Sequence, residues 1–106
     1  MAKYLVKASY TSEGAKGVMA EGGSSRRDTI NKLIQNMGGS MEAFYFAFGD
    51  DDVYVIADLP DNSAAAAVAL AVNSSNAVRL STVVLMTPEE LDEATKRSVD
   101  YRPPGG

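Results

Sequence analysis

The sequence predicts an α+β domain of the ferredoxin-like type, with an antiparallel four-stranded sheet and helices on one face. Three observations support this prediction. The chain has 106 residues, which is enough for one domain with one modest core. Its strand-like and helix-like segments follow the order β-α-β-β-α-β, with an extra C-terminal helix. The strands around Gly49–Asp52 are apolar on both faces, so the face without helices is expected to be buried by oligomerisation.

The first part of the chain is expected to form a strand and a helix. Apolar residues recur at every second position from Lys3 to Tyr10, as in a strand with one buried face. Thr11 or Ser12 then offers an N-cap for a short helix, which Gly22-Gly23 interrupts.

A second helical segment is expected after Ser24-Ser25, whose hydroxyl groups can cap it. Its apolar side chains follow the helical spacing i, i+3, i+4, i+7 at Ile30, Leu33, Ile34 and Met37. Gly38-Gly39 should end this helix, because glycine readily adopts the left-handed conformation beyond a helix C-terminus.

The middle of the chain is expected to form a hairpin of two strands, Met41–Phe48 and Val53–Asp58, around a turn at Gly49–Asp52. Strict alternation divides the apolar residues of the first strand between two faces, with Phe44, Phe46 and Phe48 opposite Met41, Ala43, Tyr45 and Ala47.

The last third of the chain is expected to complete the sheet. Asp61 should cap an alanine-rich helix, Ser63–Val72, that can pack close to the sheet. Val78–Met86 is the expected fourth strand, and the capping pattern Thr87-Pro88-Glu89-Glu90 predicts a final helix to about Arg97. The domain is therefore expected over residues 1–98, with an extended or disordered tail at 99–106.

The composition excludes several kinds of function. The net charge of −4 and the pI near 4.6 disfavour nucleic acid as a partner, because its phosphates would be repelled. The chain has no cysteine and no histidine, so thiolate chemistry, histidine-bound metals and Ser-His-Asp hydrolysis are absent. We therefore expect no cofactor and no metal. With no leader-like N-terminus and no apolar run near ~20 residues, a cytoplasmic protein that does not enter membranes is expected.

Short motifs between Lys3 and Thr87 carry a family resemblance. They are Lys3-Tyr4-Leu5-Val6, Tyr10-Thr11 with Gly14, Arg26-Arg27, Gly38-Gly39, Phe44-Tyr45, Gly49 with Asp52-Val53, and Val78-Arg79. In these motifs the chain resembles the GYD-domain family of small bacterial proteins. The motif that names that family is similar to Gly-x-Tyr-Asp-Val, whereas this chain has Asp51 at the tyrosine position. The resemblance implies a dimeric α/β barrel, in a superfamily that includes cofactor-free monooxygenases, isomerases and amino-acid-sensing effector domains.

Asp50, Asp51 and Asp52 place three carboxylates in one turn. Oxygen ligands of this kind suit Ca²⁺ or Mg²⁺. Aspartate is also a favoured turn residue, because its side chain accepts hydrogen bonds from nearby backbone N–H groups, and the turn-forming role is the favoured interpretation. Asp52, which matches the family motif, is the first of the three to test.

Arg26 and Arg27 follow the serine pair at the expected start of a helix, where cations oppose the helix dipole. An anionic ligand or a carboxylate from a second subunit would offset that cost. The alternative is that both side chains bend into solvent, where exposed charges cost little. If an anion binds here, removal of Arg27 is expected to abolish the binding.

Tyr10, Tyr45, Tyr54 and Arg79 lie on or at the ends of expected strands. Together they could bind an aromatic or carboxylate molecule, although tyrosines in strands are more often packing residues. Arg79 needs a partner, because it is a charge within an otherwise apolar strand.

These observations favour a homo-oligomeric domain that binds or senses a small anionic ligand. One alternative is a cofactor-independent enzyme of the isomerase or monooxygenase type, acting on a small organic acid or aromatic compound. Without histidine, its acid–base chemistry would fall to Asp, Tyr or Arg side chains. Another alternative is a structural assembly subunit without a pocket, so the sequence leaves open whether the protein is an enzyme.

Overall fold

The computed structural model describes all residues from Met1 to Gly106 and contains four strands and four helices. In chain order these are β1 (Ala2–Tyr10), α1 (Ser12–Glu21), α2 (Gly23–Asn36), β2 (Ser40–Phe46), β3 (Val53–Leu59), α3 (Asn62–Asn73), β4 (Val78–Leu85) and α4 (Pro88–Thr95). Every expected element is present, and the two helical segments expected on either side of Gly22-Gly23 are the helices α1 and α2. No helix combines the length and the apolar composition that a membrane crossing requires.

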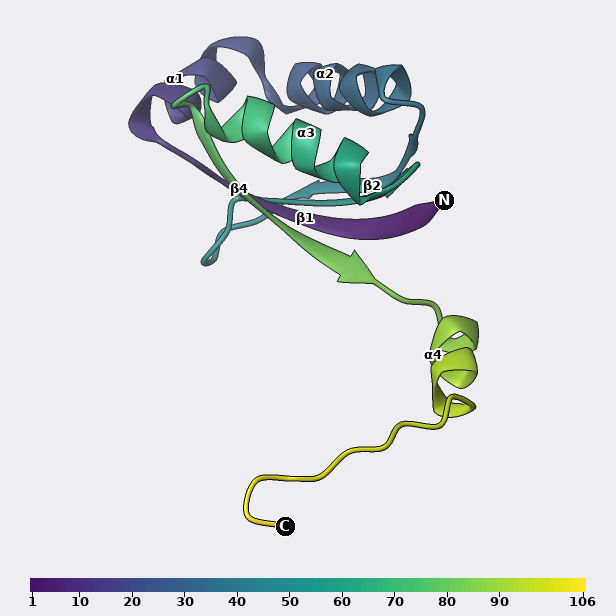
Figure 1. Ribbon diagram of the computed structural model, residues 1–106. Coiled ribbons are helices and arrows are strands. Elements are labelled where there is room, and N and C mark those ends of the chain that lie inside the picture. The colour runs from purple at the N-terminus through teal and green to yellow at the C-terminus, as the bar shows by residue number, and fades with distance from the viewer.

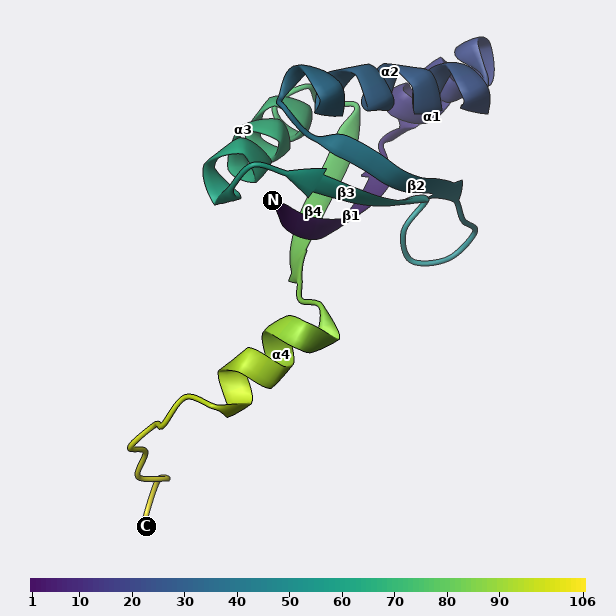
Figure 2. The same cartoon turned by 90° about the vertical axis from the view of Figure 1, so that its right-hand side faces the viewer.

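The sheet has the strand order β2-β3-β1-β4, and all neighbouring strands are antiparallel. Helices α1, α2 and α3 all lie on one face of it, as Figure 1 shows. This arrangement confirms the ferredoxin-like fold. Helix α4 and the residues after it project away from the body on the side opposite the helices (Figures 1 and 2), so no helix of the chain covers the other sheet face.

The buried core is built mainly on the two central strands. Six of its eight residues come from β1 and β3, and the helices add Ile34 and Ala65. Tyr4 is the largest buried side chain, and its hydroxyl donates a hydrogen bond to Asn62 Oδ1 at 2.6 Å. The phenol therefore fills the core while its polar end is satisfied at the start of α3.

The helix starts follow the expected caps with one exception. Thr11, Asp61 and Thr87 each accept a hydrogen bond from the third residue beyond them. Helix α2, by contrast, begins at Gly23 without a side-chain cap, so the expected cap at Ser24-Ser25 is wrong. The reason is Gly22, whose positive φ of 88° turns the chain from α1 directly into α2.

A bulge in β2 changes which residues face the helices. The register shifts between Met41 and Ala43, so Met41 pairs with Ala57 while Phe44 pairs with Val55. Ala57 and Val55 both point toward the helices, and Met41 packs against the same core as Phe44. The expected position of Met41 on the opposite face is therefore wrong, because strict alternation fails at a bulge.

The sheet face without helices carries a narrow apolar band. The strand registers place Leu5 beside Ile56 and Val83, and Ile56 beside Ala43. The apolar band, defined as Val83, Leu5, Ile56 and Ala43, thus crosses all four strands. We call this side of the sheet the open face.

Charged residues border the apolar band on both sides. On one side, Lys3 Nζ lies 3.2 Å from Asp58 and 3.2 Å from Glu42. The hydrogen bond to Asp58 and, to a smaller extent, the one to Glu42 raise the pKa of Lys3 above its usual value. On the other side, Lys7 pairs with Tyr54 and Ser81, and Arg79, which pairs with Ser9, is the next residue of β4 on the same face.

A substitution of Gly14 can test how closely α1 packs against the residues before β4. A methyl group at this buried position would collide with the carbonyl oxygen of Ala77, which also accepts the Thr11 N–H at 3.0 Å. We expect Gly14→Ala to lower the free energy of unfolding by about 1–3 kcal/mol, measured by urea denaturation. Gly17→Ala is the control in the same helix, where an added methyl meets no atom within 4 Å. It should be neutral or stabilising by up to about 1 kcal/mol. Equal stabilities of the two variants would contradict this packing.

Candidate functional site

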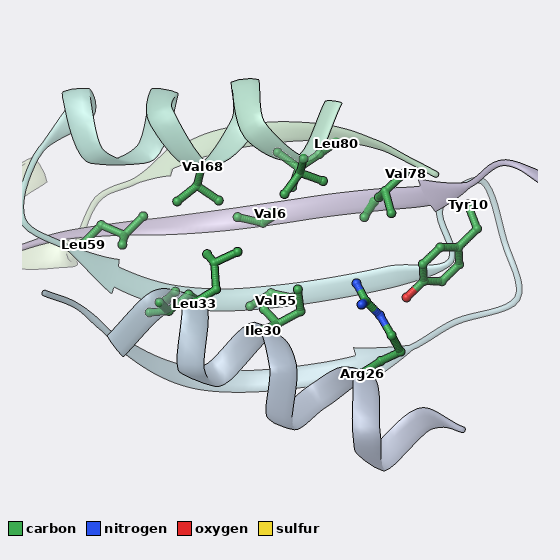
Figure 3. A pocket seen from close by; sticks show the side chains of 14 residues that line it. Val6, Tyr10, Arg26, Ile30, Leu33, Val55, Leu59, Val68, Val78 and Leu80 are labelled. Atoms are coloured by element: carbon green, nitrogen blue, oxygen red, sulfur yellow. The ribbon is translucent and has the colours of Figure 1, made fainter. Parts of the chain in front are cut away.

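A small cavity lies between the helices and the covered face of the sheet. Its volume is about 60 Å³, and 13 of its 14 lining residues are hydrophobic. Figure 3 shows Val6 and Val55 from the sheet, Leu33 from α2 and Val68 from α3 around it. The remaining lining residue is Arg26, the only charged group of this inner cavity.

Arg26 stands at one end of the inner cavity. It lies near the start of α2, and Figure 3 shows its guanidinium and the Tyr10 hydroxyl turned toward each other. The Arg26 side chain is 23% exposed, and its ion-pair partner is Glu21, with Nη1 and Oε1 4.0 Å apart. That separation is longer than a hydrogen bond. The guanidinium therefore keeps donor capacity for another group.

An outer cleft adjoins the inner cavity between the helices. Its volume is about 400 Å³, and it is also lined by Tyr10, Arg26 and Ile30. The carboxylates of Glu13 and Glu21 line it as well. Arg26 thus lines both spaces, with acidic groups on the outer side and apolar groups on the inner side. A molecule with one charged end and one apolar end matches this division.

The two adjacent arginines have different environments. Arg26 shares a helix face with Ile30 and Leu33, at spacings of four and seven residues, so it points to the cavity. Arg27 is exposed, and its Nε lies 3.3 Å from the Asp28 carboxylate. Although both arginines are candidates from the sequence, the structure brings only Arg26 together with Tyr10. The helical spacing from Arg26 to Ile30 and Leu33 is the signal that separates them.

Three further candidates lie on the open face, on the other side of the sheet. Tyr45 and Tyr54 are directly paired across β2 and β3, and Tyr45 is 71% exposed. Arg79 is exposed and lines a shallow polar hollow with Lys7 and Asp51. The structure therefore divides the candidate residues between two sites, instead of bringing Arg27, Arg79 and Asp52 to one cavity.

The aspartates of the hairpin hold the end of β1. Asp52 accepts a hydrogen bond from the Tyr10 backbone N–H at 2.9 Å, and Asp51 accepts one from the Ser9 hydroxyl at 3.2 Å. No three acidic side chains of the chain are placed to hold one metal ion. These contacts support the turn-forming interpretation of the hairpin, in which the carboxylates bind the protein itself.

Sequence reasoning did not identify Glu13 and Glu21 as residues of the site. Glu21 ends α1 and Arg26 is in the first turns of α2, so their proximity depends on the bend at Gly22. The lining residues Val68 and Val72 were also missed, since in a helix of this composition they have the pattern of ordinary core residues.

The sequence model of the GYD domain matches residues 4–95, which extend from β1 to the end of α4. The chain belongs to the GYD-domain family. No curated protein and no solved structure matched it. At the tyrosine position of the family motif, this GYD domain has Asp51, whose carboxylate binds Ser9.

The role of Asp52 in this GYD domain can be measured by substitution. Asp52→Ala removes the acceptor of the Tyr10 N–H and should lower the free energy of unfolding by about 1–3 kcal/mol. Asp50→Ala is the matched control, because its side chain is exposed, and it should change stability by less than about 0.5 kcal/mol. Chemical denaturation of both variants checks the prediction. A loss for Asp50→Ala as large as that for Asp52→Ala would refute it.

Proposed function

We propose that this GYD domain is a homo-oligomeric module that binds a small anionic molecule with an apolar part. The observation that carries the proposal is Arg26, whose side chain is largely buried at the mouth of an otherwise apolar cavity. Glu21, at 4.0 Å, is too far away to satisfy its donors.

A ligand carboxylate is the group that best complements Arg26. The planar guanidinium can donate two parallel hydrogen bonds to a carboxylate, and such charge-assisted bonds are stronger than neutral ones. The Tyr10 hydroxyl, which faces the guanidinium, offers one more donor to the same group (Figure 3). The apolar part of the ligand would then enter the inner cavity, where it is removed from water.

A second copy of the chain is the proposed occupant of the open face. The apolar band crosses all four strands, and the two sides that border it differ in charge. One side carries Lys7 and Arg79 with Asp51, while the other carries Lys3 with Asp58 and Glu42. A two-fold axis along the band would place the basic side of one copy over the acidic side of the other. Such an interface is self-complementary, and face-to-face sheets pack about 10 Å apart.

Ligand binding should be visible as thermal stabilisation. We expect a small aliphatic carboxylate to raise the Tm of the wild-type protein in a thermal shift assay. At a ligand concentration of 100 Kd the gain is about 2.7 kcal/mol, which corresponds to a Tm rise on the order of 10 °C for a domain of this size. Arg26→Met should abolish the shift and Arg27→Met should preserve it, because only Arg26 lines the cavity.

Two results would contradict the binding proposal. One is a flat response of the wild-type protein across a panel of carboxylates, phosphates and aromatic acids, which would favour a structural subunit. The other is an equal shift in the Arg26→Met and wild-type proteins.

Association can be tested at the centre of the apolar band. The wild-type protein should be a dimer or a higher oligomer at micromolar concentration in size exclusion with light scattering. Ile56→Lys should give a monomer, since a charge placed in the interface would lose its hydration without a partner. Leu70→Lys is the control, because Leu70 is 73% exposed on α3, in the helix layer. A monomeric wild-type protein, or an Ile56→Lys variant that still associates, would refute the proposed interface.

A further inference from the structure

The charges around the entrance of the site do not suit a simple anion. The outer cleft is lined by one cation, Arg26, and by two carboxylates, Glu13 and Glu21. A ligand that carries only a negative charge is attracted by Arg26 but repelled by both carboxylates. A ligand with a positive group beside its carboxylate would meet all three residues favourably.

We propose that the ligand is a zwitterion with a short aliphatic group, which is the chemistry of a free aliphatic α-amino acid. This inference rests on the proposed function and specifies the ligand of the same site. The ligand carboxylate binds Arg26, its ammonium group faces Glu21 and Glu13, and its side chain occupies the inner cavity.

The spacing of Arg26 and Glu21 fits two charges that are joined through one carbon atom. Their closest atoms lie 4.0 Å apart, so the two side chains are neighbours without forming a hydrogen bond. The side chains are 23% and 40% exposed, respectively, which leaves both open to a molecule in the cleft. An α-amino acid presents its carboxylate and its ammonium group side by side. Its carboxylate can therefore bind Arg26 while its ammonium group binds Glu21, so that the ligand bridges the two side chains.

The inner cavity limits the size of the side chain. A volume of about 60 Å³ holds roughly two groups the size of a water molecule or a methyl group, at ~30 Å³ each. A cavity that binds benzene has a volume of about 150 Å³, so an aromatic side chain would not fit without rearrangement. Because nearly all lining residues are hydrophobic, a polar side chain would lose its hydrogen bonds on entry. Valine, with its two methyl groups, matches these limits.

Three matched probes separate this inference from the proposed function. L-Valine carries both charges, 3-methylbutanoate lacks only the ammonium group, and 2-methylpropylamine lacks only the carboxylate. In isothermal titration calorimetry of the wild-type protein, we expect L-valine to bind at least about tenfold more tightly than either analogue, since each analogue leaves one charged partner unmet. L-Phenylalanine is the size control and should bind more weakly than L-valine.

The outcomes have distinct meanings. If 3-methylbutanoate binds as tightly as L-valine, the zwitterion inference fails while the proposed anion site stands. If neither these probes nor the wider panel of acids bind, both fail. If L-phenylalanine binds as tightly as L-valine, the assignment of the inner cavity to a short side chain is wrong.

A substitution of Glu21 gives a second test with opposite signs for two probes. Glu21→Gln should weaken the binding of L-valine about tenfold, because the ammonium group of the ligand loses its partner. The same change should leave the affinity for 3-methylbutanoate unchanged or raise it, because a competing carboxylate is removed from Arg26. Misfolding would weaken both probes and cannot produce this pattern. Glu89→Gln, on α4 and outside the cleft, is the matched control and should change neither affinity. Equal weakening of both probes by Glu21→Gln would overturn the inference.

Discussion

The structure depends on the fact that the chain covers only one face of its sheet. Along β1 and β3, successive side chains point alternately to the helices and away from them, so each residue has one of two environments. Six of the eight buried core residues lie on these two strands. The same alternation places Leu5 and Ile56 on the open face. The same alternation therefore places the lining of the inner cavity on one face of the sheet and the apolar band on the other. A shift of strand register by one residue would disrupt both.

The inner cavity is a departure from the close packing that protein interiors normally reach. A void of about 60 Å³ costs roughly 1–2 kcal/mol when its lining cannot collapse. It lies where α2 presents Ile30 and Leu33 while α3 contributes Val68 and Val72, and these side chains do not fill the space between the two helices and the sheet. A partly buried cation at the end of this void adds a second cost, its lost hydration. Unfavourable features of two kinds at one place are typical of binding sites, where a ligand compensates for both.

The parts of the fold that could be predicted are those set by local sequence. Alternation identified the strands, and the caps at Thr11, Asp61 and Thr87 located three helix starts because each acts within one turn. The position of Met41 could not be predicted, since its bulge exists only in the pairing with β3. The site was predictable in part. Arg26 and Tyr10 are candidates from the sequence alone, but their meeting with Glu21 depends on how Gly22 joins α1 to α2.

The hairpin that carries the family motif links the two faces of the sheet. Asp52 holds the backbone of Tyr10, whose ring lines the inner cavity, and Asp51 holds Ser9, which points to the open face beside Arg79. The Asp52 N–H also donates to the Ala8 carbonyl at 2.8 Å. The hairpin therefore forms hydrogen bonds with three consecutive residues at the end of β1, Ala8, Ser9 and Tyr10. The position of Tyr10 beside Arg26 thus depends on Asp52, which is one of the motif residues present in this chain together with Gly49 and Val53. Replacement of the motif tyrosine by Asp51 leaves that contact intact, because the two aspartates bind different residues of the strand.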